Sequence, residues 1–169
     1  MPPYRLQTLM EIRERAKEAA EQAFSEAVQA LAKEKKELQR LEEDLEQRKA
    51  TRKQRVEEYL QKILNRGVGV NGMNGQYRFE GRLKDEEAQV ALDIEKQKVA
   101  VKVAEKVVEE KRLEMAEAAK ELKAIEKHKE KWQKEVKRER EMREDLAGEE
   151  IGNALFLARV RKSSSQGDA

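Results

Sequence analysis

The chain has 169 residues, of which 43% are charged and only 4% aromatic, so it has too few large side chains for a layered globular core. Its 37 basic and 35 acidic side chains interleave and leave a net charge of +2, without the one-sided basic surplus that is typical of nucleic-acid binding. Because it has no cysteine and no apolar run of signal-peptide or membrane-spanning length, we expect a single cytoplasmic domain over residues 1–169, without a disulfide framework.

A first helix is predicted from about residue 4 to residue 65, because no proline or glycine follows Pro3 in this stretch. Its apolar residues recur at the heptad spacing of a coiled coil. The residues of the first heptad phase are Leu6, Leu9, Ala16, Ala20, Ala23 and Ala27. The residues of the second phase are Leu31, Leu38, Leu41, Leu45, Val56, Tyr59 and Ile63. The change equals a four-residue insertion and predicts a stutter, where the supercoil locally unwinds.

The segment 66–81 contains five of the chain's eight glycines. Its Asn71-Gly72 and Asn74-Gly75 dipeptides are typical of turns, because both residue types tolerate positive φ. We therefore predict a glycine-rich loop over residues 66–81, at which the chain reverses its direction.

A second helix is predicted from about residue 82 to residue 147, and its pattern can continue to residue 160. One heptad phase runs without a break from Leu83 to Leu146 and predicts a seam that includes Val90, Ile94, Val101 and Leu122. Gly148 and Gly152 then interrupt this phase, and residues 163–169 are expected to be disordered.

These elements predict an all-α fold, a long two-helix antiparallel coiled-coil hairpin. At ~1.5 Å per residue each helix would span roughly 90–100 Å. Reversal near Asn74 would place Trp132 opposite Ala16 and Leu45 opposite Ala104, so that large side chains repeatedly face small ones.

No group of residues indicates an enzyme, a cofactor or a metal site. Gly67, Gly69 and Gly72 match the G-x-G-x-x-G pattern, but a dinucleotide fold requires a preceding strand rather than a long helix. The only histidine, His128, is expected to be solvated, because a coiled-coil surface offers it no partners. The carboxylates have no pocket in which burial could shift their pKa values for acid–base catalysis.

Two groups of apolar residues lie away from the predicted seam. Leu92, Val99 and Val103 share the outer face of the second helix. They indicate either a docking stripe for a partner or scattered surface side chains. The second group, at the predicted tip, consists of Met73, Tyr77 and Phe79. It indicates either a contact site or a self-packed cap.

Apolar residues and arginines also mark the two ends of the chain. Leu6, Leu9 and Met10 lie beside Arg13, and Leu155 lies in a short apolar set that is closed by basic residues including Arg159. A hairpin is predicted to bring these ends together. Such a surface suits docking into an acidic or polar ring, and a solvated basic end is the alternative.

The chain opens with the pattern L-x-x-L-x-x-I-R, reverses at mid-chain through glycines, and contains His-Lys-Glu-Lys-Trp-Gln-Lys-Glu at residues 128–135. In these features it resembles the YscO family of type III secretion stalk proteins, whose flagellar relative is FliJ. Members of that family are antiparallel coiled coils similar to the shaft of rotary ATPase gamma subunits. The resemblance implies a non-enzymatic stalk that docks in the pore of the hexameric export ATPase, promotes its activity and links it to the export gate.

By this resemblance the ATPase-docking residues would be Leu6, Leu9, Met10, Arg13, Leu155 and Arg159. The residues that contact the export gate or secretion chaperones would be Met73, Tyr77, Phe79, Leu92, Val99 and Val103. The protein would be cytoplasmic and associated with the inner-membrane secretion apparatus. It would be a monomer in isolation, without a cofactor, nucleic acid or direct insertion into the membrane. From the residues alone, a generic coiled-coil scaffold or dimer and a nucleic-acid-binding helical arm stay open as alternatives.

Overall fold

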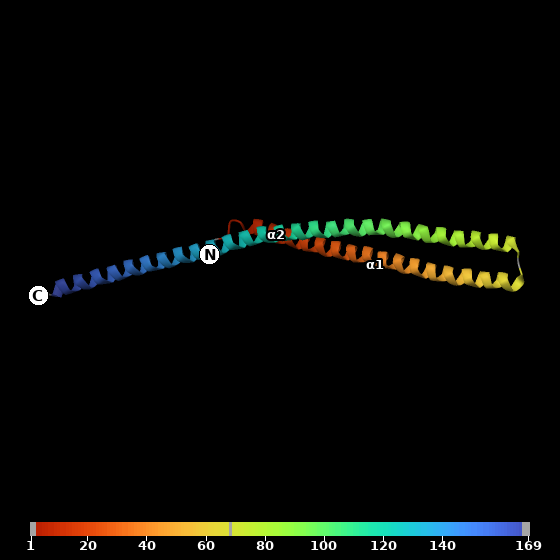
Figure 1. The fold of residues 1–169 in the computed structure, drawn as a ribbon. Helices are drawn as coiled ribbons and strands as arrows, with labels where there is room; N and C mark the ends of the chain where they lie inside the picture. The colour runs from red at the N-terminus through yellow and green to blue at the C-terminus, as the bar shows by residue number, and fades with distance from the viewer. Residues whose placement is uncertain (1–2, 68, 167–169) are drawn as a thin grey trace. The chain divides into compact units, whose positions relative to one another are not determined.

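The computed structural model describes residues 3–67 and 69–166, which form two helices, α1 (Gln7–Arg66) and α2 (Val70–Gln166). The predicted all-α two-helix hairpin is confirmed, and these residues contain no strand. The chain divides into two compact units. Unit 1 combines Met1–Lys17 with Glu117–Ala169, and unit 2 is Glu18–Ala116. In unit 2, α1 and α2 lie side by side in opposite directions and are joined by a short connector (Figure 1).

The connector between the helices is much shorter than the glycine content predicted. It comprises only residues 67–69, because α1 ends at Arg66 and α2 begins at Val70. Gly67 has a φ of 64°, the one positive value among the described residues, and this left-handed conformation is freely open only to glycine. The predicted loop over residues 66–81 is therefore wrong beyond Gly69.

Packing against α1 explains why the turn-prone residues after Gly69 are helical. Gln76 is only 5% exposed, and the ring of Phe79 stacks on that of Tyr59 with 5.9 Å between their centroids. A Cβ atom at Gly75 would lie 2.9 Å from the hydroxyl of Tyr59, so a glycine allows this close approach of the helices. Such tertiary contacts outweigh the low helix propensity of glycine and asparagine.

The far end of α2 also extends beyond its predicted limit. Gly148 and Gly152 lie within the helix, which runs through residue 160 to Gln166. Residues 163–166, expected to be disordered, are therefore helical, and residues 167–169 lie outside the described part of the chain. A helix interior tolerates single glycines at a cost of about 1 kcal/mol each relative to alanine.

The predicted seam of α2 is confirmed from Leu83 to Val136. Every heptad position in this stretch is buried or half-buried, and Ile94 and Leu122 are the most enclosed, at 5% and 7% exposure. Beyond Val136 the predicted seam positions are all exposed, including Leu146 at 58%. The heptad pattern thus identifies the packed face of α2, while the end of the packing depends on where α1 begins.

One of the two sets of seam positions in α1 keeps a single phase along the helix. The half-buried residues at seven-residue spacing are Met10, Lys17, Phe24, Leu31, Leu38, Leu45, Arg52 and Tyr59. Leu9 and Ala16, both expected in the seam, are exposed. The predicted four-residue change of phase is therefore absent, and the other set of seam positions shifts by only one residue, between Leu41 and Lys49. Long basic side chains such as Lys17 fill seam positions with their aliphatic stems, and a count of apolar residues alone misses them.

The register of the two helices differs from the prediction. In unit 2, the side-chain amide nitrogen of Gln97 donates to the backbone carbonyl of Glu34 at 3.0 Å, so Leu45 does not face Ala104. In unit 1, the ring of Trp132 packs on that of Tyr4 and not against Ala16. Both differences follow from a reversal at Gly67 instead of Asn74, which changes the partner of every residue along the seam.

Candidate functional site

In unit 1 a cluster of side chains holds the N-terminal segment against α2. The Tyr4 ring, 8% exposed, lies 5.1 Å from the ring of Trp132, and its hydroxyl is 2.7 Å from Nδ1 of His128. The Nζ of Lys129 lies 6.0 Å from the centre of the Tyr4 ring and donates to the Oε1 atom of Gln7 at 3.1 Å. We call these five residues the terminal clasp.

The terminal clasp corrects one expectation and supports another. His128 is exposed, as expected, but it has a partner that was not expected: it makes a hydrogen bond with a tyrosine that is 124 positions away in the sequence. Trp132 was expected to serve packing, and it does so with Tyr4. The carbonyl of Tyr4 also accepts a hydrogen bond of 3.1 Å from the amide of Gln7, which joins the clasp to the start of α1.

Beyond the terminal clasp, α2 continues in unit 1 as a helix without a packing partner among the described residues (Figure 1). Every residue from 137 to 163 is exposed, and we call this segment the C-terminal extension. Its large apolar side chains are 47–65% exposed and comprise Met142, Leu146, Ile151, Leu155, Phe156, Leu157 and Val160. Such a concentration of exposed apolar side chains is typical of a surface that contacts a partner.

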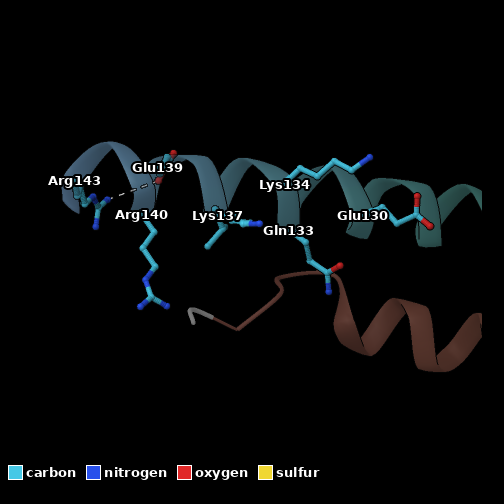
Figure 2. A pocket seen from close by; sticks show the side chains of 8 residues that line it. Glu130, Gln133, Lys134, Lys137, Glu139, Arg140 and Arg143 are labelled. Carbon is cyan, nitrogen blue, oxygen red and sulfur yellow. Dashed lines mark ion pairs between the residues drawn. The ribbon is translucent and has the colours of Figure 1, made fainter. Parts of the chain in front are cut away.

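An open groove borders the start of the C-terminal extension (Figure 2). It is lined by Glu130, Gln133, Lys134, Val136, Lys137, Glu139, Arg140 and Arg143. Its charged groups pair along the helix: Arg143 lies 3.7 Å from Glu139, and Arg140 lies 2.7 Å from Glu144. These pairs are spaced four residues apart and stabilise a helix that has no packing partner.

The six predicted ATPase-docking residues all lie in unit 1, but the structure does not bring them together. Leu6 and Leu9 are exposed beside the terminal clasp, at 36% and 38%. Leu155 and Arg159 are exposed in the C-terminal extension. Because Leu155 lies 23 positions beyond Trp132 on one helix, it is roughly 35 Å away from the clasp along the helix axis.

Met10 and Arg13, the other two of these six, belong to the seam. Both are half-buried, and the guanidinium of Arg13 forms an ion pair with the carboxylate of Glu121. Arg13 therefore contributes to the packing of α1 on α2. The predicted cluster of both chain ends is corrected: the apolar, arginine-containing surface is the C-terminal extension, which α1 does not reach.

The three predicted tip residues lie on the first turns of α2 rather than in a loop. Tyr77 is 64% exposed and Met73 is 40% exposed, whereas Phe79 is half-buried against Tyr59. Of the predicted contact residues at this end, Tyr77 and Met73 are thus accessible. Phe79 mainly holds the helices together.

A polar network joins the helices next to these residues. The Nε atom of Arg52 donates to Glu87 at 2.6 Å, and the Nη1 atom of Arg52 lies 3.7 Å from the carboxylate of Glu80. The pKa of the Glu80 carboxyl lies below its ordinary value, chiefly because Lys84 donates a hydrogen bond to it, with smaller effects from Gln76 and Arg52. The network is an interhelical clamp of paired charges, because each charged group in it has an opposite partner.

The predicted outer face of α2 is exposed as expected. Leu92, Val99 and Val103 are 58%, 61% and 55% exposed. At 100° per residue they point to the side of α2 opposite Val90, Ile94 and Val101 of the seam. Val107 and Leu113 extend the same face and were missed, although their spacing could have identified them. We call these five residues the outer face.

Two negative findings apply to residues 3–67 and 69–166. No group of three histidine, aspartate or glutamate side chains there could hold a metal ion. Neither α1 nor α2 contains, within these residues, an apolar stretch that could cross a membrane. The exposed apolar surfaces among the described residues are the C-terminal extension, the outer face and the accessible residues at the start of α2.

Comparison with known proteins adds an independent finding. The model of a family described as YscO-like protein matches residues 1–162. The fold is similar to that of a putative YscO homolog, CT670 from Chlamydia trachomatis, with a TM-score of 0.78 and 23% sequence identity. That match covers 96% of this chain and 99% of the other chain. No curated protein matches this chain at a significant level.

Proposed function

This chain belongs to the YscO-like family, and on that premise we propose that it is the non-enzymatic central stalk of a type III secretion export apparatus. The proposed stalk docks in the pore of the hexameric export ATPase, promotes ATP turnover and links the ATPase to the export gate. It works at the inner-membrane secretion apparatus as a peripheral component. The stalk acts mechanically, because it transmits a position or a torque.

The observation that carries this proposal is the C-terminal extension. It is an exposed single helix whose apolar side chains lie among charged ones, and its last apolar turns end at Arg159, Arg161 and Lys162. A single helix is about 10–12 Å wide with its side chains, which suits entry into a narrow pore. Because such a helix has no six-fold symmetry, it would make the six ATPase subunits inequivalent.

We expect Leu155→Asp combined with Arg159→Glu to abolish complex formation with the export ATPase of the same genome and the stimulation of its ATP turnover. Both side chains are exposed, so the double variant should keep its helix content. Binding is measured by gel filtration and turnover by phosphate release. The matched control is Val99→Asp with Lys102→Glu, which makes equivalent exposed changes on unit 2 and should leave the ATPase response intact.

A wild-type chain that neither binds nor stimulates a hexameric, active ATPase would refute the proposal and return the protein to an unassigned coiled-coil scaffold. Stimulation that persists in the double variant but is lost with Leu6→Asp and Leu9→Asp would move the docking surface to the start of α1. Arg13 is unsuitable as a probe, because its reversal would also break the ion pair with Glu121.

We propose that the outer face, with Tyr77 and Met73, contacts the export gate or a secretion chaperone. Lysine at both Val99 and Val103 should leave folding intact, because both side chains are more than half exposed, and should weaken gate or chaperone binding by roughly tenfold or more. Pull-down with purified gate and chaperone proteins checks this. Unchanged binding to every partner would show that these valines are ordinary surface residues.

A further inference from the structure

The seam positions of α1 and α2 share one heptad phase across the connector. The first set of α1 runs in sevens from Met10 to Tyr59, and counting on in sevens through Arg66 and Met73 reaches Glu80. From Glu80 the same count follows α2 through Ile94, Val101, Val108, Met115, Leu122, Lys129 and Val136, all of them buried or half-buried.

The second set of seam positions behaves in the same way. Ala27, Glu34 and Leu41 of α1 are in phase with Gln76, Val90 and Gln97 of α2, and all six are buried or half-buried. Near the connector this set moves by one residue, to Lys49, Val56 and Ile63, and it returns to phase at Gln76. The one-residue shift at Lys49 and the return at Gln76 are opposite in direction, so they cancel between the two helices.

A hairpin does not require one continuous phase, because its seam forms between the two helices and each helix needs only its own apolar stripe to face the other. An unbroken helix does demand it, since only a common phase keeps the whole apolar stripe on one face. In such a helix Val70 and Met73 would continue the spacing of Tyr59, Ile63 and Arg66. In the hairpin Val70 is 77% exposed and Met73 is 40% exposed.

We propose that the chain exchanges helices with a second copy of itself, forming an antiparallel domain-swapped dimer in which α1 and α2 of each copy join into one continuous helix. The α1 of each copy then packs on the α2 of the other. Contacts such as Arg52 with Glu87, Tyr59 with Phe79 and Glu34 with Gln97 form between chains with unchanged chemistry. The new contacts lie at the two-fold axis, where Val70 and Met73 of both copies become covered.

Gly67 shifts the equilibrium between the dimer and the hairpin toward the hairpin. Its φ of 64° suits glycine in the tight connector, whereas glycine is a poor residue for the continuous helix of the dimer. Exchange through a short hinge is a recognised route to dimers, because it reuses an interface that already exists. This inference concerns the seam and the connector, and it does not depend on the proposed role in secretion.

The test is Gly67→Ala, with Gly69→Ala as the matched control. Alanine at Gly67 is strained in the hairpin and favoured in the helix, so the dissociation constant of the dimer should fall by roughly 10³–10⁴-fold. A Cβ at Gly69 meets no atom within 4 Å, and Gly69 has no positive φ. Alanine at this position therefore changes only the helix propensity, and the dissociation constant of the dimer should fall by roughly 10–30-fold. Light scattering after gel filtration measures both.

Cross-linking distinguishes the swapped dimer from other dimers. The chain has no cysteine, so Glu34→Cys in one sample and Gln97→Cys in another give single reactive sites. When the two samples, each also carrying Gly67→Ala, are unfolded, mixed and refolded, a short bis-maleimide should link the chains into a covalent dimer. Chains that keep Gly67 and carry both cysteines should instead be cross-linked within one chain.

Three results would overturn the proposal. Gly67→Ala could remain a monomer, so that the mixed samples give no covalent dimer, which would show that the strained hairpin is still preferred. It could form a dimer while the mixed samples give no cross-link between position 34 of one chain and position 97 of the other, which would indicate association through another surface such as the outer face. It could also lose helix content and cross-link neither way, which would show that the connector variant opens without exchanging helices.

Discussion

Replacing Ile94 with aspartate should destabilise the protein by about 4–5 kcal/mol and remove most of the helix content of unit 2 under mild denaturant. Ile94 has the lowest exposure among the buried apolar residues, 5%. The variant loses the burial of an aliphatic side chain, worth about 1.5–3 kcal/mol. It also places a carboxylate in the seam without a cationic partner, which adds several kcal/mol.

Val99→Asp is the matched control for this prediction. It makes the same kind of change on the same helix, five positions further along, but at a side chain that is 61% exposed. Its effect should stay within roughly 0.5–1 kcal/mol, because surface substitutions outside special features cost little. Urea denaturation followed by circular dichroism at 222 nm measures both variants. Equal losses for Ile94→Asp and Val99→Asp would mean that the seam does not lie where the structure places it.

Trp132→Ala should release the N-terminal segment and lower the stability of unit 1 by about 2–4 kcal/mol. The residue is half-buried, and its ring supports Tyr4, so the substitution leaves a cavity beneath a side chain that is only 8% exposed. Amide hydrogen exchange at residues 5–10 should accelerate, because the terminal clasp no longer holds this segment on α2. The exchange of Ile94 and its neighbours in unit 2 should not change.

Trp132→Phe is the control, since it preserves an aromatic contact with Tyr4 and should restore most of the protection. Tyr4→Phe keeps the ring contact and removes the hydrogen bond to His128. It should lower the free energy of unfolding by only about 0.5–1.5 kcal/mol. If Trp132→Ala left exchange at residues 5–10 unchanged, the clasp would have no role in holding the segment. Combining Tyr4→Ala with Trp132→Ala would measure their coupling directly.

The C-terminal extension and the outer face show how far a candidate site can be predicted without the structure. Val99 was predicted as an exposed apolar residue from its position outside the heptad seam, and Leu155 was predicted as part of a docking surface at the chain ends; both are exposed. Leu146 was placed in the seam by the same rule and is 58% exposed. The rule tells which face of a helix is apolar, but it does not tell where the partner helix stops.

The amino-acid sequence by itself determined that the chain forms two long helices and which face of α2 packs. The reason is that helical geometry converts a seven-residue repeat directly into one stripe along the helix, so that Val90, Ile94 and Val101 must share a side. This reading needs no knowledge of any distant residue. The balanced, interleaved charges likewise indicated a solvated surface.

Only the tertiary structure decided where the chain reverses and which residues meet. The glycines and asparagines of residues 70–81 favour turns locally, yet the packing of Gln76 and Phe79 against α1 makes them helical and leaves Gly67 to form the reversal. That choice sets the register of the seam and brings Tyr4 to His128 and Trp132. Such contacts depend on the sum of many interactions between distant segments, and no local pattern in the sequence contains that sum.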